Sequence, residues 1–204
     1  MEIVIAQKKH IIFSEIISDT ITDSANVRGT GIAKRTAVYI QQKIENGNAI
    51  IALDGGEFAG FCYIESWSHG KFVANSGLIV HPDYRGKGLA KKIKEKIFKH
   101  SRKKFPNAKV FSITTGLAVM KMNSNLGYKP VTFSELTEDE SFWDGCKTCK
   151  NYDVLQRTEQ KMCLCTGMLF DPTSVALKSK KPIKETVFKR LKKIKETLYL
   201  KKKK

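Results

Sequence analysis

The sequence lacks any apolar run approaching the roughly 20 residues that a helix needs to cross a bilayer. The apolar stretch near the amino terminus is also too short for a secretory signal peptide, because Ile11, Ile12 and Phe13 are followed directly by Ser14 and Glu15. These absences make the cytoplasm the expected location. In that compartment the five cysteines are expected as thiols or metal ligands rather than as disulfides.

Acidic residues are scarce as well, since 20 Asp and Glu stand against 37 Lys and Arg, for a net charge of +17. The imbalance is concentrated in residues 175–204, which hold 13 Lys and Arg and only two acidic residues. The first 174 residues hold 24 basic and 18 acidic side chains. The hydrophobic fraction of 41% is enough for a proper core. The composition therefore predicts a mildly basic folded domain with a strongly basic tail.

The basic tail has its own periodicity. Val187, Leu191, Ile194 and Leu198 recur at helical spacing, which predicts an amphipathic helix over residues 184–200 with a lysine face. An anionic membrane surface, nucleic acid or a partner helix would each suit such a helix, and so would a solubilising role without any partner. Aromatic residues do not alternate with the basic ones, so sequence-specific nucleic-acid binding is not expected.

Hydrophobic periodicity predicts both strands and helices in the rest of the chain. Strands are expected at residues 2–6, 49–53, 58–67, 72–80, 109–115 and 128–133. Helices are expected at residues 9–18, 36–46, 89–104 and 117–126. Asp54-Gly55-Gly56 predicts a tight hairpin turn, because Asp-Gly tolerates positive φ angles. The helices interrupt a mostly antiparallel sheet rather than alternating with every strand, so the expected fold class is α+β.

Residues 77–92 combine the features of a pyrophosphate site. A strand ends at Val80, Pro82 stops further pairing, and the glycines of Arg85-Gly86-Lys87-Gly88 let the backbone approach a ligand closely. A helix begins directly afterwards, so its unpaired N–H groups and positive dipole end face the loop. A strand end, a glycine loop with two cations and a helix start together predict pyrophosphate binding.

The string Val80-x-Pro82 followed by Arg85-x-x-Gly88-x-Ala90 resembles the acyl-CoA signature of the GNAT N-acetyltransferase superfamily. The expected order of elements is similar to that fold, and the resemblance covers residues 1–135. It implies a mixed, mostly antiparallel central sheet flanked by helices. We therefore expect a GNAT-like core at residues 1–135, a Cys-rich extension packed on it at residues 136–174, and the basic tail at residues 175–204.

The resemblance also implies a set of cofactor-binding residues for acetyl-CoA or another acyl-CoA. Main-chain amides of the loop would bind the pyrophosphate, and the end of the preceding strand would line the pantetheine arm. A main-chain N–H near Leu78 would polarise the thioester carbonyl as an oxyanion donor. The implied cofactor-binding residues are Ile79, Val80, Arg85, Gly86, Lys87, Gly88, Leu89 and Ala90.

The implied reaction is direct attack of a primary amine on the thioester within a ternary complex. An alkyl ammonium has a pKa of roughly 10, so a base must first remove a proton. The strand at residues 72–80, where some relatives place a glutamate, offers only Asn75 and Ser76. Glu65 is the candidate base, directly or through water, and His69 and His81 are alternatives.

The sequence departs from the family at the last helix of the expected core. Many relatives carry a tyrosine four residues before the terminal glycine, and that tyrosine protonates the departing thiolate. Counting back from Gly127, Asn123 stands at the position of this tyrosine. Gly116 stands at the helix start, where many relatives carry an asparagine. Because the pKa of the CoA thiol is comparable to that of cysteine, about 8.5, the loss slows transfer without forbidding it. The departure also motivates an alternative, a non-catalytic CoA-binding sensor or regulatory protein.

A second basic glycine loop, residues 28–35, echoes the first. In GNAT folds this region forms the acceptor side of the cleft, so Arg28, Lys34 and Arg35 would hold an anionic acceptor, most simply an amino-acid carboxylate. A solvated basic loop is the alternative. With the first interpretation, the acceptor is a small acidic, amino-acid-like amine. A protein acetyltransferase guided by the basic tail is a further alternative.

Four cysteines form two close pairs, Cys146-x-x-Cys149 and Cys163-x-Cys165. Four thiols in two pairs can complete the tetrahedral shell of a structural zinc, and buried thiols without a metal are the alternative. A closed four-thiolate site would be structural rather than catalytic and would hold the extension on the domain. The fifth, Cys62, lies in the middle of a strand and is expected to pack in the core.

Overall fold

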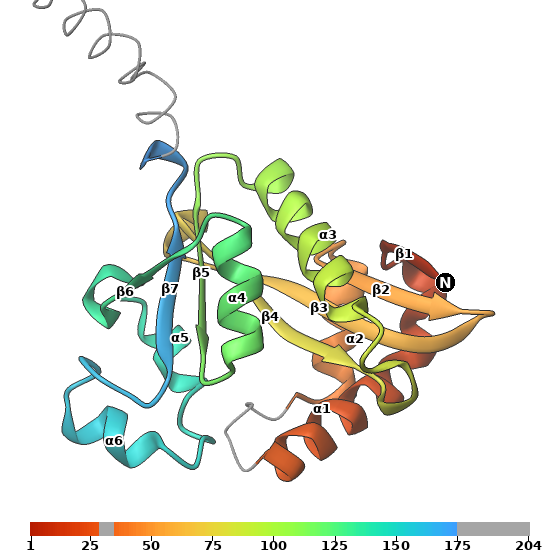
Figure 1. Ribbon diagram of the computed structural model, residues 1–204, viewed down its shortest axis with the longest axis horizontal. Helices are drawn as coiled ribbons and strands as arrows, with labels where there is room; N and C mark the ends of the chain where they lie inside the picture. The colour runs from red at the N-terminus through yellow and green to blue at the C-terminus, as the bar shows by residue number, and fades with distance from the viewer. Residues whose placement is uncertain (29–34, 175–204) are drawn as a thin grey trace, which may run out of the picture. The chain divides into compact units, whose positions relative to one another are not determined.

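The computed structural model describes residues 1–28 and 35–174 and contains one seven-stranded sheet in the order β1-β2-β3-β4-β5-β7-β6 (Figure 1). The strands are β1 (Glu2–Ile5), β2 (Ala49–Asp54), β3 (Glu57–Trp67), β4 (Phe72–Val80), β5 (Lys109–Thr114), β6 (Lys129–Val131) and β7 (Thr166–Phe170). The α-helices are α1 (Ser14–Arg28), α2 (Ala37–Glu45), α3 (Leu89–Lys104), α4 (Leu117–Asn125), α5 (Glu140–Asp144) and α6 (Tyr152–Arg157). The predicted α+β class with a mostly antiparallel sheet is confirmed.

Strands β1 to β4 form an antiparallel meander, as predicted. The β2–β3 turn contains Gly55 at φ +60° and Gly56 at φ +95°, in the left-handed region that favours glycine. Along β2, Ile50 and Ala52 enter one hydrophobic cluster and Ala49 and Ile51 enter the other. The strand is therefore buried on both faces, which explains its continuous apolar run.

Strands β4 and β5 run parallel but pair over only three residues, Phe72–Ala74 of β4 with Lys109–Phe111 of β5. Beyond that short ladder the two strands diverge, as Figure 1 shows, and their remaining residues lie on the two sides of a gap. In this part of the sheet β4 and β5 have no ladder pairing with each other. The gap is the feature of the fold that positions the site.

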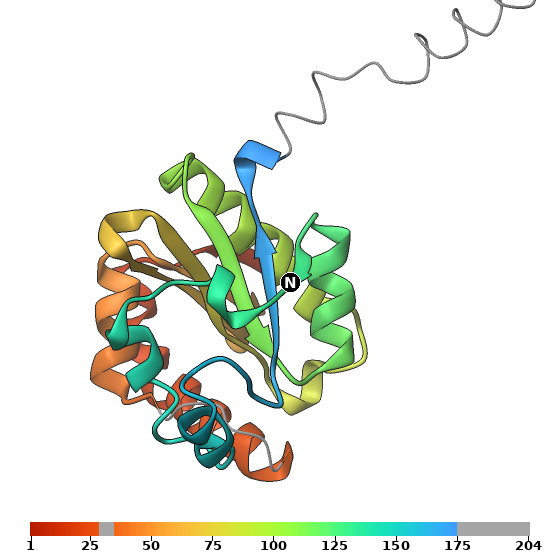
Figure 2. The same cartoon turned by 90° about the vertical axis from the view of Figure 1, so that its left-hand side faces the viewer.

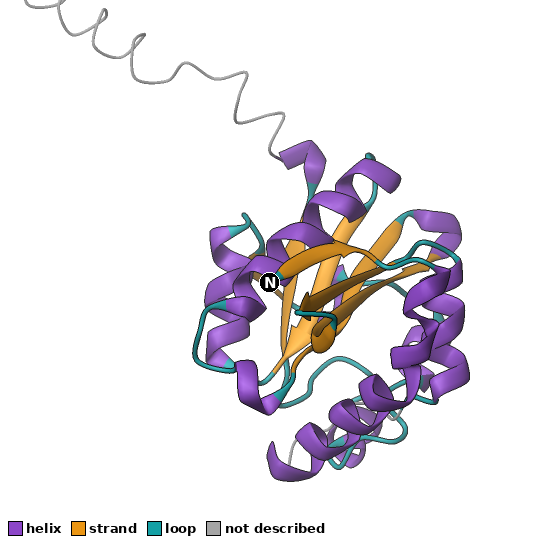
Figure 3. Cartoon of the chain, turned by 90° about the vertical axis from the view of Figure 1, so that its right-hand side faces the viewer, coloured by secondary structure: helices purple, strands orange, loops and turns teal. Residues whose placement is uncertain are grey.

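Helices cover both faces of the sheet, as Figure 3 shows. Helices α1 and α2 contribute Ile17, Ile21, Ile40 and Ile44 to the cluster on one face. Helix α3 contributes Leu89, Ile93 and Ile97 to the cluster on the other face, at the helical spacing that the sequence predicted. Among the described residues no helix is both long and apolar enough to span a bilayer.

The Cys-rich segment supplies a strand that the sequence analysis did not predict. β7 lies between β5 and β6 and pairs antiparallel with both, and Figure 2 shows it lying along β5. The compact unit accordingly runs from Met1 to Asp171. The division of the chain at residue 135 stays a proposal, since the segment after it completes the sheet rather than only packing on it.

A further difference concerns the amino-terminal region. The helix expected at residues 9–18 is a 3₁₀ segment, Lys8–Phe13, followed by the longer α1, which also takes in residues expected as loop. Gln7 and His10 close a reciprocal cap at the start of the 3₁₀ segment. The predicted tail helix at residues 184–200, like Lys34, lies outside the described residues.

Candidate active site

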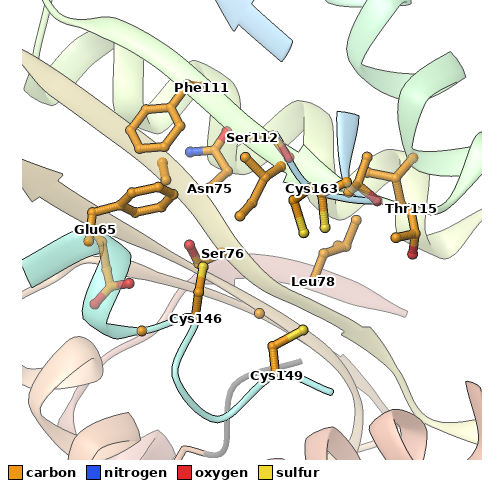
Figure 4. A pocket seen from close by; sticks show the side chains of 18 of the residues that line it. Glu65, Asn75, Ser76, Leu78, Phe111, Ser112, Thr115, Cys146, Cys149 and Cys163 are labelled. Carbon is orange, nitrogen blue, oxygen red and sulfur yellow. The ribbon is translucent and has the colours of Figure 1, made fainter. Parts of the chain in front are cut away.

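A pocket of about 570 Å³ occupies the gap between β4 and β5 (Figure 4). One wall is formed by Asn75–Ile79 of β4 and the other by Phe111–Thr115 of the β5 segment. Side chains from β3, from α5 and α6 and from the segment before β7 enclose the remaining sides. The pocket therefore lies between β4 and β5, where these two strands diverge and no longer pair with each other.

A β-bulge lies in the pocket wall. The β3–β4 register pairs Phe61 with Ile79 and Tyr63 with Ser76, so Gly77 and Leu78 together face the single residue between. Gly77 has φ +62°, and a Cβ there would come within 2.3 Å of the Tyr63 ring, so glycine is required on both counts. Bulges turn main-chain groups out of the ladder. Leu78, the expected oxyanion donor, lies in this bulge and lines the pocket, and its role stays a prediction.

Glu65 lines the same pocket and is surrounded by donors. Lys43 Nζ lies 3.2 Å from its Oε1, Arg35 Nη2 lies 3.9 Å from its Oε2, and the Tyr39 hydroxyl donates to Oε1. Its side chain is only 15% exposed. Burial raises the pKa of Glu65 and outweighs the attraction of Arg35, which lowers it. A carboxylate with a raised pKa is a better proton acceptor than an exposed one.

Arg35 is the residue of the second glycine loop that reaches the pocket. It lines the pocket, donates from Nε to the Tyr63 hydroxyl at 2.7 Å and has its guanidinium over the Tyr39 ring. Lys34 lies outside the described residues, and of Arg28 only the backbone, at the end of α1, is described. The expected role of these three residues therefore rests structurally on Arg35.

The loop at residues 85–90 contains two glycines in the left-handed region of backbone conformation. Gly86 and Gly88 have φ +78° and +74°, and a Cβ at either would meet no protein atom within 4 Å. Gly88 is the N-cap of α3 and has no side chain to cap the helix, so it leaves the first N–H groups without a capping side chain at that position. Leu89 and Ala90 pack against the core and hold the helix start in place.

The side chains around this loop divide their roles. Arg85 is turned back toward the fold, with Nε 3.1 Å from the Val80 carbonyl and Nη2 3.0 Å from Ser24 Oγ. It therefore ties the loop to β4 and α1, whereas the exposed Lys87 has its Nζ 3.4 Å from the Asp83 carbonyl and 5.8 Å from the centre of the Tyr84 ring. Ile79 lines the pocket, and Val80 is buried beside it. The loop and the pocket are thus joined through the end of β4.

The family model of the GNAT acetyltransferases matches residues 19–122, just over half of the chain. The chain belongs to the GNAT acetyltransferase family. A search of the curated proteins finds no match.

Solved structures similar to this chain have the same GNAT fold at low sequence identity. An N-acetylglutamate synthase from Neisseria gonorrhoeae, complexed with coenzyme A and N-acetyl-glutamate, has a TM-score of 0.60 and 15% identity over 83% of this chain. This chain covers 34% of that one. A GNAT acetyltransferase from Staphylococcus aureus Mu50 has a TM-score of 0.60 and 12% identity over 84% of this chain and 98% of its own. A phosphinothricin acetyltransferase from Sinorhizobium meliloti, complexed with AcCoA, has a TM-score of 0.56 and 14% identity over 83% of this chain and 87% of its own.

The four cysteines of the extension line the GNAT pocket opposite β4. Cys146, Cys149, Cys163 and Cys165 are half-buried and none is in a disulfide. Burial raises the pKa of Cys146 to about 11 and of Cys165 to about 12. In the described part of the chain no group of three or more His, Cys, Asp or Glu side chains is placed to hold a metal ion. The zinc interpretation is therefore not supported, and the cysteines are thiols in the wall of the pocket.

Three other residues from the sequence analysis lie away from the pocket. Asn123 is fully buried in α4, with Nδ2 3.7 Å from Met168 Sδ of β7. Its Oδ1 has no hydrogen-bond partner among the described residues. His69 is exposed in the β3–β4 turn, and the His81 ring packs against Phe58 and Tyr84. Of the proposed bases, only Glu65 lines the pocket.

Sequence reasoning missed the neighbours that define the surroundings of Glu65. Tyr39 and Lys43 lie four residues apart on one face of α2, and Tyr63 lies two residues before Glu65 on β3. Strand alternation places Tyr63 and Glu65 on the same face of β3, so their position side by side could have been predicted. The approach of α2 to that face is a tertiary contact for which the sequence holds no local pattern.

Proposed function

We propose that this GNAT protein transfers an acetyl or other short acyl group from acyl-CoA to the primary amine of a small acidic, amino-acid-like acceptor. The observation that carries the proposal is the junction of two features at the end of β4. The open glycine loop at residues 85–90 leads directly into a pocket that holds Glu65 and Arg35. The loop suits a pyrophosphate, and the pocket suits an amine that also carries a carboxylate.

The acyl-CoA half of the site uses main-chain groups. The amides of Gly86 to Ala90 would bind the pyrophosphate at the positive end of the α3 dipole. Pantetheine would lie in the gap between β4 and β5 and satisfy strand groups that have no ladder partner there. The Leu78 N–H in the bulge would then polarise the thioester carbonyl. With this binding mode the acyl carbon would lie in the pocket that Glu65 lines.

The acceptor half of the site uses charged side chains. The Arg35 guanidinium offers the planar donor pair that a carboxylate accepts. Glu65, with its raised pKa, would take the proton from the acceptor ammonium, directly or through a water molecule, before attack. Lys43 and Arg35 keep the Glu65 carboxylate in place between substrate turnovers. The Neisseria N-acetylglutamate synthase, whose structure contains N-acetyl-glutamate, supports an acidic acceptor by analogy.

A second candidate function is favoured by one observation. Asn123 replaces the tyrosine that the family uses as general acid, and it is buried away from the pocket. A CoA-binding protein without turnover, acting as a sensor or regulatory subunit, would need no acid. Protein acetylation guided by the tail at residues 175–204 stays a proposal from the sequence alone.

The proposal is tested by screening the full chain with acetyl-CoA and succinyl-CoA against matched amines. The panel pairs glutamate with glutamine and aspartate with asparagine, and adds lysine, spermidine and a peptide. Mass spectrometry should detect the N-acylated acid, with a kcat/KM on the order of 10-fold above that of its amide, because only the acid pairs with Arg35. CoA binding without any acylated product would support the sensor instead, and a preference for spermidine or the peptide would refute the acidic acceptor.

A further inference from the structure

We propose that the Tyr63 hydroxyl protonates the departing CoA thiolate. It would thus be the general acid of the reaction, a role that the buried Asn123 is not placed to fill. The inference rests on the proposed acyl transfer.

The Tyr63 ring lies directly against the bulge of β4. A Cβ built on Gly77 would come within 2.3 Å of Tyr63 Cε1 and 3.3 Å of Cζ, the atom that carries the hydroxyl. The phenol therefore lies beside Gly77, one residue before Leu78, whose N–H is the proposed oxyanion donor. A thioester whose carbonyl oxygen accepts from Leu78 would have its sulfur close to this hydroxyl.

The contact with Arg35 determines which way the Tyr63 hydroxyl donates its hydrogen. Arg35 Nε donates to the phenolic oxygen at 2.7 Å, so the hydroxyl accepts from the arginine and must donate its own hydrogen elsewhere. Tyr63 is only 1% exposed and lines the pocket, which leaves the pocket as the place for that donation. Burial raises the pKa of Tyr63 and Arg35 lowers it, so the phenol is protonated at neutral pH.

Tyr63 and Glu65 lie two residues apart on one face of β3, and Arg35 contacts both side chains. The strand thus presents a proton donor and a proton acceptor side by side, at a spacing of about 7 Å. In the reaction the amine nitrogen forms a bond to the acyl carbon, and the carbon–sulfur bond breaks. The ammonium proton that Glu65 takes before attack is released to solvent. As the carbon–nitrogen bond forms, the nitrogen loses its second proton to Glu65, and the Tyr63 proton passes to the sulfur. Glu65 or solvent returns a proton to Tyr63 once CoA leaves.

Other hydroxyl groups of the pocket are less suited to this step. The Tyr39 hydroxyl donates to Glu65 Oε1 and is thereby occupied. Tyr152 comes from α6 on the opposite wall. The thiols of Cys146 and Cys165 line the pocket from the segment after residue 140 rather than from the β3–β4 bulge. Among the tyrosines that line the pocket in the described part of the chain, Tyr63 is the one that lies against the bulge, two residues from the proposed base.

The test compares Tyr63→Phe with Tyr152→Phe, which removes a hydroxyl from the opposite wall of the same pocket. Tyr63→Phe should lower kcat about 100-fold while the Kd for CoA and the KM for acetyl-CoA stay within about twofold of the wild type. Tyr152→Phe should retain activity. An acetyl thioester of a CoA analogue with a more acidic thiol needs less protonation, so with this donor the loss in Tyr63→Phe should shrink to a few-fold.

Incorporation of a fluorinated tyrosine at position 63 keeps the shape of the side chain and lowers its pKa. The alkaline limb of the kcat profile should then move to lower pH. Wild-type turnover with a Tyr63→Phe rate close to that of Tyr152→Phe would overturn the inference. An equal loss with both thioesters, or loss of CoA binding, would overturn it by showing a structural role. Absence of any wild-type turnover would instead contradict the proposed function itself.

Discussion

Lys94 is a buried cation among neutral partners. Its side chain is 1% exposed, its Nζ lies 3.5 Å from Asn75 Oδ1, and it stands over the Tyr128 ring at 5.2 Å. The Tyr128 hydroxyl donates to the same Asn75 oxygen at 3.2 Å. None of the ion pairs recorded for the described residues includes Lys94. Burial lowers its pKa from 10.5 to about 8, and the neighbouring Cys62 has the opposite, smaller effect.

This lowered pKa predicts that the free energy of unfolding rises between pH 7 and pH 9. The folded-state pKa of about 8 lies below the unfolded value of 10.5, so the unfolded chain binds more protons in between and stability increases with pH. The gain from Lys94 should be about 1 kcal/mol by urea unfolding, and Lys94→Met should abolish it. Above pH 9 the buried thiols, whose pKa values are raised, act in the opposite sense.

The control for this prediction is Lys96→Met, which removes an exposed lysine from the same helix. That variant should keep the increase with pH. An equal slope in Lys94→Met and in the wild type would show that Lys94 titrates normally. A single buried lysine would then have no part in the pH dependence.

At the scale of elements, β7 makes the Cys-rich segment part of the core. Met168 is 1% exposed at the centre of the strand and packs with Val110 of β5 and Tyr128 in the cluster on the α3 face. Met168→Ala should lower the free energy of unfolding by about 2–5 kcal/mol, because it removes buried methylene groups and leaves a cavity. The melting temperature should fall by on the order of 10 °C.

Met162→Ala is the matched control, since that methionine is 66% exposed and precedes the strand. Its melting temperature should equal that of the wild type. If Met168→Ala melts at the same temperature as the control, β7 does not stabilise the sheet. The segment after residue 135 would then be an accessory that packs on a complete core.

The elements that the sequence predicted are those with local patterns. The meander from β2 to β4 follows from strand periodicity and an Asp-Gly turn, and α3 follows from its spaced isoleucines. β7 was missed because its partner strands lie far away in sequence and its apolar run follows a cysteine pair that drew the interpretation toward metal. A short strand of this kind is defined by its neighbours rather than by its own pattern.

The site shows the same division. Glycines at positive φ in the loop at residues 85–90 were predictable, because main-chain geometry limits the choice of residue. Glu65 was found as a carboxylate on the right strand. The contacts of Tyr63 and Glu65 with Arg35 and of Glu65 with Lys43 were not predictable, because they join residues more than 20 positions apart through packing of α2 on β3. Such contacts are properties of the folded chain.

For the whole molecule, the proposed acyl-CoA site joins the divergence of β4 from β5 to the open loop before α3. A side chain at position 88 would intrude where the backbone must meet phosphate, although it meets no protein atom within 4 Å. Gly55, with φ +60° and equally open space, lies in the β2–β3 turn outside the pocket and the loop. Valine at either position carries a similar backbone strain.

The most direct measurement is therefore the calorimetric Kd for coenzyme A of the wild type, Gly88→Val and Gly55→Val. Binding of the pyrophosphate by the loop predicts a Kd at least about 100-fold higher for Gly88→Val, a cost of roughly 3 kcal/mol, and an unchanged Kd for Gly55→Val. Wild-type affinity in a folded Gly88→Val variant would contradict the assignment of the loop, and with it the proposed acyl transfer.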